Sequence, residues 1–472
     1  MSGAGGAAEG AAALRRAFGL VVSVLCLFLV AKTADGAAGR DLGQVPFAAA
    51  LFVLPLLYAL PATRRWWAAR RWWLLAAQTV LTYVPFALFG SSWVAGLSGL
   101  LAGLVLLTVT APASWLVAGA LAAGEVAIRA GLVGLPVDAG KWPVVWVVTA
   151  YVDNGLALFG LARLADMVAR VHAARGELAE VAVSKERARA TRALQSAVGE
   201  RLAAVSARAA AALRVLGGSP GQARELVTEA GRLARQALAE VRATTGASDP
   251  VPHGERAGPG TGAGVAPRLA LTVLIVVLCG FWAQTVNLVL GAHARPVVTA
   301  VAAVCGLVIV ALQLYQSRPR PAGGRPRAWP WTLTAQALLV YGMVAALWET
   351  LWGTGFAFAG FLAGSALLLI SGRRGRLGYA AVVASVPLLL PIWPPAGVTF
   401  TPRQEIAAII YFTAVTAGIG LLVYGLSLLA GLAVQLEELR GELAAAAAAQ
   451  ERARGSPGTP MTCWAWACRP PR

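Results

Sequence analysis

Long apolar segments follow one another along most of this 472-residue chain, and they limit what it can fold into. Hydrophobic residues make up 58% of the sequence and charged residues only 13%, whereas soluble domains are usually about one quarter charged. A stretch of about 20 apolar residues can cross the hydrocarbon core of a lipid bilayer as an α-helix. Because lipid offers no hydrogen-bond partners, the helix must satisfy its own backbone. The sequence therefore predicts an all-α, polytopic protein of the lipid bilayer.

We predict about twelve transmembrane helices, arranged as two modules of about six helices each. The spans of the first half are expected at residues 17–33, 44–62, 72–90, 93–110, 113–131 and 142–162. Those of the second half are expected at residues 268–290, 296–315, 330–349, 353–371, 377–392 and 405–430. The membrane modules therefore cover residues 1–162 and 268–430.

The net charge of +18 comes mostly from arginines in short loops between the apolar segments. Such clusters lie at Arg15–Arg16, Arg64–Arg71, Arg163–Arg175, Arg318–Arg327 and Arg373–Arg376. Cytoplasmic loops of membrane proteins carry this excess of positive charge. We therefore expect a multi-pass protein of the cell membrane, with both termini and residues 163–267 in the cytoplasm. Because membrane topology accounts for the charge, nucleic acid is not expected as a partner.

The two halves of the chain share short motifs. Positions of the third and fourth spans recur as follows: Trp73–Gln78 as Trp331–Gln336, Tyr83 as Tyr341, and Gly99–Gly103 as Gly360–Gly364. The segments after the last span of each half agree best: Arg175–Ala179 recurs as Arg440–Ala444, and Glu186–Arg189 as Glu451–Arg454. These two charged pairs keep the same offset, which biased composition does not explain. The halves are therefore interpreted as tandem copies of one module.

Residues 163–243, between the modules, are predicted to form an exit helix and a helical hairpin. The first helix continues out of the sixth span, and its apolar residues recur every three or four positions from Leu194 to Leu216. Gly217-Gly218 ends this helix, and Ser219-Pro220 is a start signal for the next one. A lone hairpin buries little apolar surface, so we expect a homodimer through residues 186–243 that forms a four-helix bundle.

The segment that opens the hairpin, Glu186–Gly199, contains Glu-Arg-Ala-Arg followed by Leu194-Gln195-Ser196. With the membrane module and the exit helix, it resembles an actinobacterial two-component sensor histidine kinase. In the subgroup concerned, a Glu-Arg-x-Arg…Leu-His-Asp motif carries the phosphoacceptor histidine. Gln195 occupies the position of that histidine and Ser196 that of the acidic neighbour. A carboxamide does not replace an imidazole as a phosphoryl acceptor, so the resemblance implies a degenerate hairpin that still dimerises.

The family's ATP-binding domain has no counterpart between the hairpin and the seventh span, because only a flexible Gly- and Pro-rich linker, 244–267, lies there. ATP and Mg are therefore expected only if a missing kinase domain is restored, and no other cofactor is expected. Residues 431–454 are predicted to form a cytoplasmic signalling helix. Residues 455–472 form an aberrant or disordered tail, which is either the product of a reading-frame shift or natural.

The resemblance implies a membrane sensor that transmits a signal by helix movement to the hairpin and is catalytically inactive as given. Its expected partners are a second copy and a response regulator or a partner kinase. The alternative is a secondary transporter, because twelve spans in two halves with a central cytoplasmic segment are also the layout of the major facilitator class. Residues 62–71 lack the Gly-x-x-x-Asp-Arg-x-Gly-Arg-Arg motif of that class, which favours the sensor.

Four polar residues in or near the spans form a candidate intramembrane polar site: Glu125, Asp153, Asn154 and Glu349. Carboxylates inside a membrane are costly and often mark ligand or proton sites. The structural alternative is that they lie near a membrane edge, and Glu125 can pair with Arg129 one helical turn later. No catalytic residue is assigned. No metal site is expected either, because His172, His253 and His293 are scattered.

Overall fold

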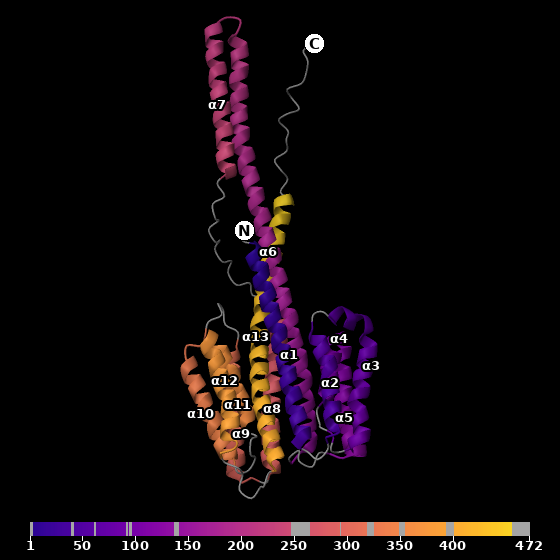
Figure 1. Ribbon diagram of the computed structural model, residues 1–472. Coiled ribbons are helices and arrows are strands. Elements are labelled where there is room, and N and C mark those ends of the chain that lie inside the picture. The colour runs from indigo at the N-terminus through magenta and orange to yellow at the C-terminus, as the bar shows by residue number, and fades with distance from the viewer. Residues whose placement is uncertain are drawn as a thin grey trace. The chain divides into compact units, whose positions relative to one another are not determined.

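The computed structural model gives a fold in which every described element is a helix (Figure 1). It describes residues 3–38, 42–60, 63–90, 93, 97–135, 141–246, 265–292, 294–318, 325–348, 355–392 and 401–455. Contacts divide the chain into two units. We call Met1–His172 with Gly262–Glu437 the membrane unit, and Ala173–Thr261 with Glu438–Arg472 the hairpin unit.

Each predicted span overlaps one described helix. The helices of the first half are α1 (Gly3–Ala38), α2 (Gln44–Ala59), α3 (Arg64–Phe89), α4 (Ser98–Thr108), α5 (Ala113–Ile128) and α6 (Pro143–Val215). Those of the second half are α8 (Val265–Gly291), α9 (Pro296–Ser317), α10 (Trp329–Leu347), α11 (Phe356–Leu369), α12 (Gly372–Leu389) and α13 (Pro402–Gly455). The last helices of the halves, α6 and α13, run on beyond their apolar segments, and we call them the exit helices.

Eight of the described helices are long and apolar enough to cross a membrane: α1, α3, α5, α6, α8, α9, α10 and α13. The helices α2, α4 and α11 are apolar but shorter. These three helices have 16, 11 and 14 residues, fewer than the roughly 20 that cover a hydrocarbon core about 30 Å thick. The remaining helix, α12, has 18 residues and carries Arg373, Arg374 and Arg376 at its start. The protein is thus an all-α, polytopic membrane protein, and the count of twelve spans stays a prediction.

In the first half, α4 lies against the exit helix α6 at glycines. A Cβ atom added to Gly99 would overlap the carbonyl oxygen of Tyr151. One added to Gly103 would lie 2.9 Å from the carbonyl oxygen of Gly155. Since lipid tails are as apolar as leucine, helices in a membrane associate through close packing, which small residues permit. The Gly99–Gly103 motif therefore has a packing role.

The second half repeats this contact between α11 and the exit helix α13. A Cβ atom on Gly360 would lie 2.7 Å from the Cβ of Ile419, and one on Gly364 would lie 2.9 Å from the carbonyl oxygen of Gly420. Gly420 follows Gly155 by 265 residues, the same spacing that separates Glu451 from Glu186. The glycine motif that recurs in the sequence thus makes the corresponding helix contact in each half.

The exit helices also contact each other and helices of the opposite half within the membrane unit. A Cβ atom on Gly160 of α6 would overlap Leu426 of α13 and would lie 3.4 Å from Val273 of α8. One on Gly425 of α13 would lie 2.7 Å from Leu20 of α1 and 2.8 Å from Leu161 of α6. The helices α1, α6, α8 and α13 therefore share one apolar core.

The hairpin unit contains the last part of α6 and the whole of α7 (Pro220–Gly246). α6 ends at Val215 and α7 begins at Pro220, as the Gly-Gly-Ser-Pro sequence predicts. An ion pair joins the two helices, with 3.2 Å between Arg208 Nε and Glu229 Oε1. The prediction of a helical hairpin here is confirmed.

Leucine in place of Gly360 or of Gly99 is expected to force α11 or α4 away from its exit helix. Overpacking of this kind typically costs about 1–3 kcal/mol, so the unfolding midpoint in detergent should fall clearly. Gly342→Leu on α10 is the matched control, because nothing lies within 4 Å of a Cβ atom there. An equal loss of stability in all three variants would show that the glycine contacts are unimportant.

Candidate functional site

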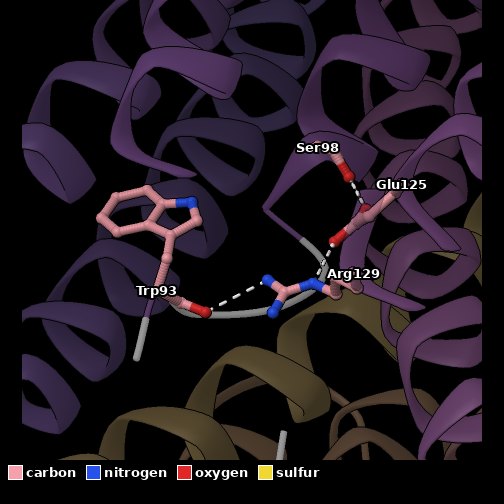
Figure 2. A network of polar contacts seen from close by, with 4 residues as sticks. All are labelled: Trp93, Ser98, Glu125 and Arg129. Carbon is pink, nitrogen blue, oxygen red and sulfur yellow. Dashed lines mark hydrogen bonds and ion pairs between the residues drawn. The ribbon is translucent and has the colours of Figure 1, made fainter. Parts of the chain in front are cut away.

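A buried polar network surrounds Glu125 in the first half of the membrane unit (Figure 2). The ion pair of Glu125 and Arg129 has 3.3 Å between Oε1 and Nε, and the two side chains are 1% and 0% exposed. The hydroxyl of Ser98 donates a hydrogen bond to the other carboxylate oxygen. Arg129 Nη2 donates to the carbonyl oxygen of Trp93 at 3.1 Å. Glu125 lies in the last turn of α5 and Arg129 directly follows that helix, so the two charges lie on one face, because residues four apart are neighbours.

Local backbone geometry helps to hold Arg129. A π-helical turn runs from Arg129 to Val133 and ends at Gly134, which has a φ of 96°. The guanidinium carbon lies 4.8 Å from the centre of the Phe86 ring, which adds a cation–π contact from α3. The network thus links α3, α4 and α5. Because its opposite charges compensate each other, the network fits a structural role better than an open binding site. We call it the clamp, since it holds these three helices together.

The sequence-based alternative for Glu125, pairing with Arg129, is therefore confirmed. Glu349 lies outside the described residues. Asn154 lies on α6, where its Cβ packs against Gly99, the neighbour of Ser98. The grouping of the four residues into one polar site stays a prediction.

Asp153 instead lies on α6 against α8, the first helix of the second half. Its side chain is 5% exposed and its Oδ2 accepts a hydrogen bond from Gln284 Nε2 at 3.5 Å. Within the described part of the chain, Oδ1 has no hydrogen-bond partner. The carboxylate also fills the space beside Gly280, where a Cβ atom would overlap it. Asp153 is thus a polar contact between the halves.

Sequence reasoning missed a second polar contact between the halves, at Asn287 of α8. Its Oδ1 accepts a hydrogen bond from the backbone N–H of Trp142 at 2.8 Å. Its Nδ2 donates to the carbonyl oxygen of Trp142 at 3.1 Å. One side chain therefore holds the backbone that precedes α6. The only signal for it was an asparagine inside an apolar span.

A third polar cluster, also missed, joins four helices of the second half. Gln336 of α10 and Ser365 of α11 both donate to Gln313 Oε1 of α9, at 3.1 and 2.8 Å. Ser427 of the exit helix α13 donates to Ser317 of α9 at 2.8 Å. All five side chains are at most 5% exposed.

Gln336 of this cluster corresponds to Gln78 in the first half. The Nε2 of Gln78 donates to the carbonyl oxygen of Leu51 at 3.1 Å, so this glutamine is buried and hydrogen-bonded in both halves.

In the hairpin unit, Gln195 and Ser196 lie on α6 with exposed side chains. Their exposure leaves this position accessible to another protein. In the described residues no group of three or more His, Cys, Asp or Glu side chains could hold a metal ion.

Comparison with known protein families gives a match in this hairpin. Residues 186–252 match a family model described as histidine kinase. The match supports a sensor histidine kinase. It begins at Glu186, includes Gln195 and Ser196, and extends over α7. Comparisons with curated proteins and with solved structures gave no significant match. The transporter alternative receives no support from these findings.

Removing Glu125 alone should destabilise the membrane unit strongly. Glu125→Gln leaves Arg129 buried without its counter-charge, which typically costs about 3–5 kcal/mol. The double variant Glu125→Leu/Arg129→Met should recover most of the loss in thermal unfolding of the full chain in detergent.

Glu186→Gln is the control for this experiment, because the Glu186–Arg189 pair is 50% and 62% exposed. Exposed ion pairs contribute at most about 1 kcal/mol. A single Glu125 variant as stable as this control would contradict the role of the clamp.

Proposed function

We propose that the protein is a dimeric membrane sensor of the two-component histidine-kinase type. The observation that carries the proposal is the histidine kinase match at residues 186–252, which begins on the same helix as the sixth apolar segment. Because α6 is continuous from Pro143 to Val215, a rotation or shift at its apolar end is transmitted to the matched segment. Histidine-kinase-type signal transduction is thus coupled to a membrane helix.

The apolar surface of the hairpin supports pairing with a second copy. Leu202, Leu213 and Leu216 of α6 are 61%, 74% and 57% exposed, and Val227 and Leu238 of α7 are 59% and 53% exposed. A groove of about 630 Å³, lined by Leu213, Leu216 and Val227, lies near the turn. Exposed apolar surface of this extent typically marks an interface. Two hairpins would cover it in a four-helix bundle formed by residues 186–243.

The chain is proposed to be inactive as a phosphoacceptor. Gln195 stands where the histidine is expected, and a carboxamide has no free imidazole nitrogen to form the phosphoryl bond. Ser196 supplies no carboxylate to orient a base. The proposed role is therefore to sense and to modulate a partner, either a response regulator or a kinase that carries its own ATP-binding domain. ATP and Mg would enter only through such a domain.

We further propose that the two membrane modules are tandem copies of one sensing unit. The recurrence of Glu186–Arg189 as Glu451–Arg454 and the matching glycine contacts of α4 on α6 and α11 on α13 support this. Each copy ends in an exit helix, and a transporter would need no such helix after its last span. The second exit helix is the proposed signalling helix of residues 431–454.

Charge placed on the apolar face of the hairpin should dissociate the dimer. Leu213→Glu/Leu216→Glu removes four leucine side chains from the dimer, two in each subunit, and the burial of each is worth about 1.5 kcal/mol or more, so dimer affinity should fall by about 10,000-fold. The measurement is subunit exchange between two fluorescently labelled preparations of the full chain in nanodiscs. Ala207→Glu is the control, since Ala207 is exposed on another face of α6. Equal exchange in the control and the double variant would argue against this interface.

Restoring the histidine should restore phosphate acceptance. When the full chain is mixed with ATP, Mg and an active histidine kinase of this type, the wild type should carry no acid-labile phosphate within residues 186–252. Gln195→His should carry it, and Gln195→Asn should not, because only the imidazole is a phosphoryl acceptor. Labelling of the wild type in this segment would show that another residue takes the role.

A further inference from the structure

An apolar groove of about 340 Å³ opens between the helices α4, α5, α6 and α8 of the membrane unit. Its lining includes Trp115 and Gly119 of α5, Gly155 of α6, and Val273 and Val276 of α8. It therefore joins an exit helix to helices of both halves.

Small side chains create this groove. At Gly119 nothing lies within 4 Å of an added Cβ atom, so the helix surface there is open. Tyr151, the bulkiest polar residue of the lining, donates its hydroxyl to the carbonyl oxygen of Ala118 at 2.6 Å. This bond satisfies the hydroxyl, and the groove presents hydrocarbon surface to an occupant.

The surroundings of the groove limit what that occupant can be. The helices α5, α6 and α8 are long, apolar membrane helices, so the opening faces lipid and not water. Trp115 lies near the start of α5 and Leu269 near the start of α8, ends that the loop charges predict to be cytoplasmic. The groove thus lies in the cytoplasmic half of the bilayer in that orientation.

A cation lies beyond the same end of the groove. The ring of Trp115 makes an edge-to-face contact with Phe159, with centroids 6.0 Å apart. The guanidinium carbon of Arg163 lies 5.4 Å from the centre of the Phe159 ring. Arg163 forms no ion pair with any described residue, and two turns of α6 separate it from Gly155, a rise of about 12 Å. Its charge is therefore placed to meet an anion at the membrane surface.

We propose that this groove binds one acyl chain of an anionic phospholipid of the cytoplasmic leaflet, with the phosphate headgroup at Arg163. The chain fills the apolar volume between Gly119 and Val273, and the guanidinium pairs with the phosphate. Because the occupant touches α6 at Gly155 and at Arg163, its presence biases the position of the exit helix. This regulatory consequence rests on the proposed sensor function, whereas lipid binding itself does not.

The test is photocrosslinking of the full chain in phosphatidylcholine nanodiscs that contain a small fraction of phosphatidylglycerol with a diazirine in its acyl chain. Peptide mass spectrometry should place the label on α5, α6 and α8 around the groove. Gly119→Leu fills the groove and should abolish this labelling. Gly124→Leu, on the same helix and also without atoms within 4 Å of an added Cβ, should keep it. Ala122→Phe, at another lining position, should repeat the loss if Gly119→Leu folds poorly.

A second comparison tests the headgroup. Arg163→Gln should label equally with the phosphatidylglycerol probe and with a phosphatidylcholine probe of the same tail, whereas the wild type should favour phosphatidylglycerol. Uniform labelling of all helices, or undiminished labelling in Gly119→Leu, would overturn the groove as a lipid site. Equal labelling of the wild type by both probes would overturn the anionic preference. Neither result depends on dimerisation or phosphate transfer, so subunit exchange by the hairpin tests the sensor proposal separately.

Discussion

The close contact between a glycine-bearing helix and an exit helix is the constraint on which the membrane unit depends. In each half, the glycines at Gly99–Gly103 or Gly360–Gly364 bring one backbone against another, near Gly155 or Gly420. In the hydrocarbon core of a bilayer there is no hydrophobic driving force for apolar helices to associate. The helices are therefore held together by close packing and by polar contacts. This contact holds the short helix α4 against the exit helix α6, and α11 against α13.

Polar contacts then distinguish the two halves. The first half has a buried ion pair, Glu125–Arg129, whereas the second has a network of neutral amides and hydroxyls around Gln313. Neutral groups avoid the desolvation penalty that a buried charge carries. Ser427 connects the neutral network to α13, so the second exit helix is bonded to its own module. The first exit helix is bonded across the halves, through Asp153 and Gln284.

Local patterns in the sequence predicted what depends on local structure. The helix positions, the turn at Gly217–Pro220 and the pairing of Glu125 with Arg129 follow from apolar length, turn residues and a spacing of four. The hydrogen bond between Asp153 and Gln284 joins residues 131 positions apart, and that between Asn287 and Trp142 joins residues 145 positions apart. Such contacts arise when two modules pack together. No spacing in the sequence indicates which of these residues will be partners. The burial of Gln336 was likewise invisible, although its recurrence at Gln78 marked the position.

The contact between Gly280 and Asp153 has a consequence for how such a chain can evolve. A side chain at Gly280 would meet the carboxylate of Asp153, so that the carboxylate would have to move. The residue allowed at this position of the second half therefore depends on a residue of the first half. If the modules began as identical copies, this contact has made them complementary parts.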